Sequence, residues 1–175
     1  MHGIEICTRT SDLESVVEVL HAVHDHDGYP TVWPEDPTSW LTPPGTLGAW
    51  VAISGGTVVG HALLVPGKSI EHAAHVARAA GVPPSRIGGV SRLFVSPSAR
   101  GGGAAAKLME HIEAEAHARG LRLALDVIDE GGPAIRLYEG RGWLRVATGP
   151  AGWVRPDGTR PRSAAYLCPA VSASI

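Results

Sequence analysis

The sequence has little that would cross-link the chain, carry it through a membrane or bind it to nucleic acid. Its two cysteines, Cys7 and Cys168, lack the density of a secreted disulfide framework. The 15 Lys and Arg residues against 17 Asp and Glu leave no basic excess for nucleic acid. No apolar run approaches the roughly 18 residues that indicate a membrane span, and the first residues lack the charged and apolar parts of a signal peptide. We therefore expect a cytoplasmic protein with reduced cysteines and with neither a nucleic-acid nor a membrane partner.

Phenylalanine is also scarce, with one in 175 residues, although 44% of the residues are hydrophobic. An apolar set dominated by Ala, Val and Leu favours helices packed on a sheet over an aromatic-rich β-sandwich. This apolar fraction is enough to build a core without disulfides or a metal. The length is slightly above the commonest domain size, so we expect a single domain over residues 1–175.

Hydrophobic spacing predicts the element order β-α-(α)-β-β-α-β-α-β-α-β-β. The predicted strands cover residues 4–7, 47–54, 57–65, 90–95, 121–128, 143–148 and 163–167. One predicted helix begins near residue 13, and the others cover residues 70–80, 103–119 and 133–139. Ser11 and Glu14 fit a capping box at the first helix, and Gly55-Gly56 favours a tight hairpin. This order predicts a mixed sheet with helices on both faces.

The stretch from residue 24 to residue 45 lacks periodicity and is long for a connection inside a compact domain. Such a stretch predicts a functional loop or a short irregular helix. Close to its start, His21, His24 and His26 could suggest a metal site. Nothing else in the chain completes such a site, so we expect a polar rim there and no metal.

The segment from Val95 to Ala106 carries the main functional signal. A strand ends at Val95, a glycine-rich turn follows, and a long helix begins. The first amides of that helix have no partner within it, and the helix dipole adds positive potential. Arg100 adds a cationic side chain that can form charge-assisted hydrogen bonds. The turn therefore predicts a site for an anion such as a phosphate.

Several classes of glycine turn compete for this segment. The mononucleotide loop needs Lys followed by Ser or Thr at the helix start, and their absence excludes it. The dinucleotide fingerprint matches the glycine spacing of residues 101–106, with Asp126 about twenty residues further on. However, five residues, Pro97 among them, separate Val95 from the first glycine, whereas that fingerprint starts almost at the strand end. A structural turn that holds no ligand is a further alternative.

Residues 93–97, followed by Arg100, Gly103 and Ala105, resemble the acetyl-CoA motif of the GNAT superfamily of N-acetyltransferases. Residues 123–127 and 134–143 resemble the next strand and helix of that family, so the resemblance covers about residues 88–145. It implies an α/β (α+β) fold in which helices flank a mixed, mostly antiparallel central sheet of about six to seven strands. It also implies transfer of an acetyl group from acetyl-CoA to a primary amine that attacks the thioester directly.

The resemblance assigns the cofactor-binding residues. Beside Arg100, the amides that would hold the pyrophosphate belong to Gly101, Gly102, Gly103, Ala104, Ala105 and Ala106. The main chain of Leu93, Phe94 and Val95 would bind the pantetheine arm and orient the thioester carbonyl, and donors aimed at a developing oxyanion favour acyl transfer. Gly131 stands where the family often has an Asn on the pantetheine side.

The resemblance also assigns catalytic roles. Tyr138 matches the tyrosine that protonates the departing thiolate, and the alternative is that its ring only packs beneath the cofactor. Many members have a glutamate base where this chain has Gly89, yet the attacking amine must still lose a proton. Asp126 is the first candidate base, unless it is a strand-end carboxylate satisfied by backbone amides. The other candidates are Asp27, His26, His24, Glu71 and His75.

In the family the acceptor enters over the segments that correspond here to residues 24–45 and 149–162. Acidic and aromatic residues in the first segment predict a rim for a small-molecule amine, and the candidate acceptor residues are His26, Asp27, Tyr29 and Trp33. Arg155, Arg160 and Arg162 could instead recognise a carboxylate on the acceptor. A non-catalytic acyl-CoA binding or sensing module is the alternative function, and the resemblance also allows a homodimer.

Overall fold

The computed structural model describes residues 2–170 and divides them into two compact units. The first unit comprises residues up to 65 together with 90–112, and the second comprises residues 66–89 and the chain from 113 onward. Strand β4 (Ile87–Val95) and helix α4 (Ala104–Ala118) contribute residues to both units. A single domain over residues 1–175 stays a prediction.

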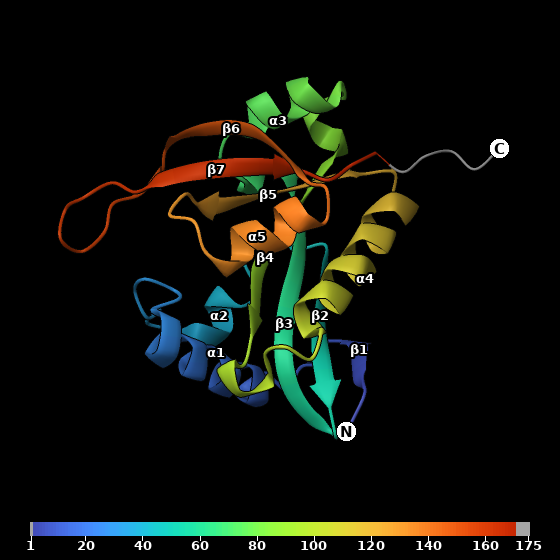
Figure 1. The fold of residues 1–175 in the computed structure, drawn as a ribbon, viewed down its shortest axis with the longest axis vertical. Coiled ribbons are helices and arrows are strands. Elements are labelled where there is room, and N and C mark those ends of the chain that lie inside the picture. Colours follow the sequence, from blue (N-terminus) through green and yellow to red (C-terminus); the bar gives the residue numbers. More distant parts are fainter. Residues whose placement is uncertain (1, 171–175) are drawn as a thin grey trace. The chain divides into compact units, whose positions relative to one another are not determined.

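The strands of the described residues form one seven-stranded sheet in the order β1-β2-β3-β4-β5-β7-β6 (Figure 1). Besides β4, they are β1 (Ile4–Thr8), β2 (Gly48–Ser54), β3 (Thr57–Pro66), β5 (Arg122–Ile128), β6 (Leu144–Pro150) and β7 (Arg162–Leu167). β4 and β5 run parallel, whereas β1–β2, β2–β3, β5–β7 and β6–β7 pair antiparallel. The predicted mixed, mostly antiparallel α/β fold is confirmed.

The helices other than α4 are α1 (Glu14–Asp27), α2 (Pro37–Trp40), α3 (Ala73–Ala80) and α5 (Pro133–Gly140). Within residues 2–170, none of the helices has the length and apolar character needed to cross a membrane.

In the first unit, helices cover both faces of the sheet. Val51 of β2 packs with Val16 and Leu20 of α1 in one buried cluster. The preceding residue, Trp50, has its ring centroid 5.2 Å from that of His111 on α4. Because successive strand residues point to opposite faces, α1 and α4 lie on opposite sides of β2.

The second unit shows the same alternation on β7. Ala165 and Leu167 belong to a buried cluster with Val76 of α3. Between them, Tyr166 has its ring centroid 6.1 Å from that of Tyr138 on α5. Helices α3 and α5 therefore cover opposite faces of this strand.

Two turns follow their sequence signals. Gly55 and Gly56 join β2 to β3 with φ values of 56° and 78°, the positive angles that a primed hairpin turn requires. Gly81 ends α3 in the left-handed region with φ 68°. α3 begins at Ala73, later than predicted, because residues 67–69 form a 3-10 turn and His72 adopts φ 60°.

The predicted capping box at the first helix is wrong. Leu13 occupies the N-cap of α1 and makes no side-chain cap bond. Instead, the Glu14 amide donates to Asp12 Oδ1 at 3.1 Å, and the Asp12 amide donates to Thr10 Oγ1 at 3.3 Å. Asp12 is closer in the chain to the free amides than Ser11 is, and its carboxylate is the stronger acceptor.

Candidate functional site

The glycine turn in the first unit has the geometry that the sequence predicts. β4 ends at Val95, residues 97–99 form a 3-10 turn, and α4 begins at Ala104. Gly101 and Gly103 have φ values of 83° and 86°, in the region that favours glycine. The Lys107 amide is bonded to the Gly103 carbonyl at 3.0 Å, so the amides of residues 104–106 lie ahead of the helical ladder. The turn can therefore offer several amides to an anion.

Arg100 is paired with Asp27 at the end of α1. Arg100 Nη1 donates to Asp27 Oδ1 at 3.1 Å, and Nη2 donates to Oδ2 and, at 3.4 Å, to the Val95 carbonyl. His26 Nδ1 also lies 2.7 Å from Asp27 Oδ1. The hydrogen bond from Arg100 is the main reason that the pKa of Asp27 falls to about 2. A residue predicted for the donor and one predicted for the acceptor thus contact each other directly.

β4 carries an irregular residue immediately before the predicted pantetheine segment. Arg92 has φ 48°, which is uncommon for a residue with a side chain. Its Nε donates to the Trp40 carbonyl at 2.8 Å, and its guanidinium carbon lies 4.3 Å from the centroid of the Trp40 ring. Its carbonyl is 2.9 Å from Nδ1 of His61, a fully buried residue of β3. Sequence reasoning missed His61, although it is the only ionisable side chain in that apolar strand.

The predicted acceptor residues of the first unit lie on and after the end of α1. Tyr29 is partly exposed, and its ring centroid lies 6.5 Å from that of Phe94 on β4 and 6.1 Å from that of Trp40. The Trp33 ring contacts the imidazoles of His21 and His24, with centroids 5.0 and 5.3 Å apart. The side chain of His26 is 62% exposed, so it is open to a ligand.

Asp36 of the same segment has a structural task. Its carboxylate accepts hydrogen bonds from the Ser39 amide at 3.2 Å, the Ser39 hydroxyl at 2.6 Å and the Thr38 hydroxyl at 2.7 Å. These bonds cap α2, and the Ser39 hydroxyl is the main reason that the pKa of Asp36 falls to about 2. This acidic residue of segment 24–45 therefore stabilises the fold of the segment.

Tyr138 lies on α5 in the second unit and is 7% exposed. Its ring centroid is 6.0 Å from that of Trp143 and 6.1 Å from that of Tyr166. The ring therefore packs in an aromatic group that fixes its place. Before α5, Gly131 has φ 70°. Asn, the residue that the family often has at this position, also tolerates this left-handed region, so either residue can adopt this backbone conformation.

Asp126 on β5 is joined to Glu71, another candidate base. Asp126 Oδ2 accepts a hydrogen bond from the Glu71 amide at 2.6 Å. Glu71 Oε1 accepts from the Gly152 amide and Oε2 from the Ser163 hydroxyl, both at 2.6 Å. His72 Nε2 lies 2.8 Å from the same hydroxyl. The sequence did not reveal Ser163 and His72, which complete a polar network in the second unit.

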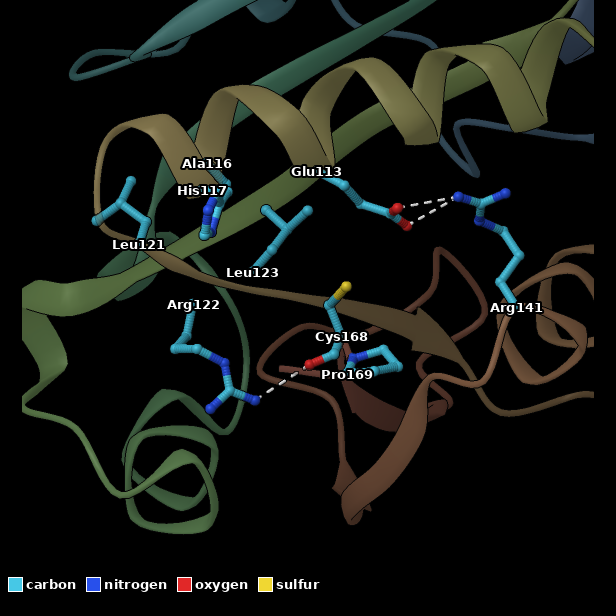
Figure 2. Close-up of a pocket in the computed structure, with 9 residues that line it drawn as sticks. All are labelled: Glu113, Ala116, His117, Leu121, Arg122, Leu123, Arg141, Cys168 and Pro169. Atoms are coloured by element: carbon cyan, nitrogen blue, oxygen red, sulfur yellow. Dashed lines mark hydrogen bonds and ion pairs between the residues drawn. The ribbon is translucent and has the colours of Figure 1, made fainter. Parts of the chain in front are cut away.

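The second unit also contains a cavity of about 280 Å³ at the end of α4 (Figure 2). Arg122 Nη2 donates to the Cys168 carbonyl at 3.1 Å, and Arg141 Nη2 lies 3.0 Å from Glu113 Oε2. Burial raises the pKa of the Cys168 thiol to about 12, so this thiol stays protonated. None of the predicted site residues lines the cavity, and both arginines have protein partners.

In the part of the chain that the structure describes, no three potential metal ligands come together.

A model of the acetyltransferase (GNAT) family matches residues 13–143, three quarters of the chain. The chain belongs to the GNAT acetyltransferase family. GNAT enzymes take the acetyl group from acetyl-CoA, so acetyl-CoA is the co-substrate of this acetyltransferase. The resemblance stated from the sequence is thereby confirmed. A comparison with curated proteins by sequence finds no match.

Solved GNAT structures share the fold across nearly the whole chain. Ribosomal-protein-S18-alanine N-acetyltransferase from Escherichia coli is 19% identical and superposes with a TM-score of 0.70, covering 98% of this chain and 96% of that one. Arabidopsis thaliana NAA60 in complex with acetyl-CoA is 18% identical with a TM-score of 0.68, covering 93% and 97%. A candidate phosphinothricin N-acetyltransferase is 19% identical with a TM-score of 0.70, covering 97% and 100%. Likeness at this identity establishes the fold and leaves the acceptor class open.

Proposed function

We propose that this GNAT acetyltransferase transfers the acetyl group of acetyl-CoA to the primary amine of a small molecule. The amine nitrogen attacks the thioester carbonyl, a C–N bond forms, and the C–S bond breaks. One proton leaves the amine, and one is taken up by the departing thiolate. The observation that supports acetyl-CoA as the donor is the glycine turn between β4 and α4, with Arg100 at its start and free helix amides at its end.

The donor half of the proposal uses two parts of the first unit. The amides from Gly101 to Ala106 hold the pyrophosphate, and Arg100 exchanges Asp27 for a phosphate oxygen. The main chain of Leu93, Phe94 and Val95 pairs with the pantetheine arm and directs the thioester carbonyl. Gly131, in the second unit, is assigned to the pantetheine side of the donor.

The catalytic half uses residues of the second unit. Tyr138 gives a proton to the thiolate, and its packing against Trp143 and Tyr166 supports this role because it restricts the phenol to one place. A phenol of pKa about 10 protonates the thiolate of a thiol of pKa about 8.5 only when it is well positioned. Asp126 is the proposed base, since its exposed carboxylate is oriented by the Glu71 amide. Glu71, Asp27, His26, His24 and His75 remain the other candidate bases.

The proposal of a small acceptor rests on the aromatic residues near β4. Tyr29 and Trp40 contact each other, and Tyr29 also contacts Phe94 in the strand assigned to the pantetheine arm. Together with His26, Asp27 and Trp33, Tyr29 would form a rim suited to a compact amine.

We also propose a cytoplasmic location and a homodimer. The free thiols of Cys7 and Cys168 agree with a reducing compartment.

The test measures CoA release with acetyl-CoA and two acceptor panels, one of small primary amines and one of peptides with free N-termini. We expect turnover on small amines, and we expect Arg100→Ala to raise the KM for acetyl-CoA in that reaction. Turnover on the peptides alone would move the acceptor to proteins while leaving the donor assignment intact. CoA binding without turnover on either panel would instead favour a sensing module.

A further inference from the structure

His61 is a buried polar residue in an otherwise apolar strand. Its side chain is fully buried on β3, next to Ala62 and Leu63, which are also fully buried. An imidazole at such a place loses its hydration and needs hydrogen-bond partners to offset that loss. An aliphatic side chain would fill the space without this requirement, so the partners of His61 indicate what the residue does.

Arg9 determines which nitrogen of His61 carries the proton. Arg9 Nη1 lies 2.9 Å from His61 Nε2, and a guanidinium can only donate, so Nε2 accepts. His61 Nδ1 therefore carries the hydrogen and donates it to the Arg92 carbonyl at 2.9 Å. Arg9 is itself held by the Leu41 carbonyl at 2.7 Å and the Thr42 hydroxyl at 2.6 Å. Burial lowers the pKa of His61 to about 4, which keeps this neutral form in place at neutral pH.

Arg92 is held from two sides in an unfavourable backbone conformation. Its φ of 48° is in the left-handed region, which a residue with a side chain rarely adopts inside a strand. His61 binds its carbonyl, while Trp40 holds its guanidinium by a hydrogen bond and by ring contact. Such a conformation persists only where the surroundings determine it, and here His61 and Trp40 do so.

The segment after Arg92 is the one assigned to the acyl donor. Leu93, Phe94 and Val95 follow directly, and the next amide, that of Ser96, is bonded to the Val59 carbonyl at 2.7 Å. The His61 ring also stacks on Phe94, with centroids 5.0 Å apart and planes 25° from parallel. The direction of the main-chain donors in this segment therefore depends on the conformation of Arg92.

We propose that His61, fixed by Arg9, is a positioning residue for acetyl transfer: it holds the Arg92 carbonyl and thereby orients the main chain of residues 93–95 toward the thioester. This inference rests on the proposed function, in which that main chain binds the pantetheine arm. It adds a specific residue of β3 to the donor site, and it predicts that His61 acts on the pantetheine half of the donor and not on its pyrophosphate half.

Two His61 variants test the proposal by separating the two halves of the donor. His61→Phe keeps a ring on Phe94 but removes both hydrogen bonds, whereas His61→Asn keeps an N–H near the position of Nδ1. We expect His61→Phe to lower kcat about tenfold to a hundredfold, as misplacement of reacting groups does, and to weaken acetyl-CoA binding. Binding of ADP, which carries the pyrophosphate without pantetheine, should stay unchanged, and His61→Asn should recover most of the loss.

Unchanged kcat and acetyl-CoA affinity in His61→Phe would overturn the inference, as would an equal loss of ADP and acetyl-CoA binding. A wild-type protein that binds no CoA, or turns none over, would instead contradict the proposed function. If His61→Phe does not fold, Arg92→Gly and Arg92→Ala decide. Both remove the side chain, but only glycine adopts a positive φ freely, so the glycine variant should retain more activity. Equal kcat values for these two variants would also overturn the inference.

Discussion

The side chains of Arg100 and Asp27 form a bidentate ion pair that joins the glycine turn to the end of α1. Nη1 is 3.1 Å from Oδ1, and Nη2 donates to Oδ2. The same guanidinium is assigned to the pyrophosphate of acetyl-CoA. In the proposed function Asp27 and a phosphate would therefore compete for Arg100, which would link donor binding to a residue of the proposed acceptor rim.

Asp27→Asn should tighten the binding of CoA. The change removes the competing carboxylate and a negative charge near the phosphates, and an exposed pair of this kind corresponds to about a two- to fivefold change in affinity. Isothermal titration with CoA measures it. Asp25→Asn is the matched control, because Asp25 lies on the same helix, 3.1 Å from His21. Equal or weaker CoA binding by Asp27→Asn would show that Asp27 supports Arg100 and does not compete for it.

His61 should make the stability of the protein depend on pH between about 6.5 and 4. Its folded-state pKa is lowered to about 4 from an ordinary 6.5, so below pH 6.5 the unfolded chain binds the proton first. The stabilisation is complete above pH 6.5, declines as the pH falls and levels off below about 4. A shift of this size corresponds to about 3 kcal/mol. Urea unfolding at several pH values from 4 to 7 gives the free energy of unfolding as a function of pH. This free energy should change less with pH for His61→Asn than for wild type. An equal dependence on pH in the two proteins would contradict this role of His61.

Tyr138→Phe should lower kcat while leaving the KM for acetyl-CoA nearly unchanged. The ring still packs against Trp143 and Tyr166 while the hydroxyl that would donate the proton is removed, and we expect a decrease of at least about tenfold. Steady-state kinetics at saturating amine measure it. Tyr166→Phe is the matched control, because its hydroxyl is bonded to Glu139 at 2.7 Å and Arg145 at 3.1 Å. If the two variants have the same kcat, Tyr138 acts by packing alone.

Glu71→Ala should raise the KM for the amine more than that for acetyl-CoA. Glu71 binds the Gly152 amide and the buried Ser163 hydroxyl, so its loss frees the segment that follows β6 and leaves Ser163 without one acceptor. Ser163 keeps His72 as a partner, but a lost hydrogen bond to a charged group costs about 1.5–3 kcal/mol, so thermal stability should fall as well. Ser163→Ala, which removes the donor instead, should have the smaller effect on both measurements. A larger change in the KM for acetyl-CoA would place Glu71 on the donor side.

The parts of the fold that could be predicted from the sequence depend on neighbouring residues. The Gly55-Gly56 hairpin and the turn before α4 follow from residues a few positions apart. The capping box failed even at short range, because Asp12 offered a competing acceptor. The pairs Arg100–Asp27 and His61–Arg92 join residues that are 73 and 31 positions apart, and no local pattern marks them. Such contacts depend on how strands and helices pack, which spacing alone does not specify.

We propose that this acetyltransferase uses a small-molecule amine as its acceptor. The most direct test incubates the purified protein with acetyl-CoA and a panel of small primary amines, and then quantifies both free CoA thiol and acetylated amine by mass spectrometry. We expect equal amounts of both products and a lower rate for Arg100→Ala at subsaturating acetyl-CoA. Binding of CoA with no acetylated amine from any member of the panel would contradict the proposal.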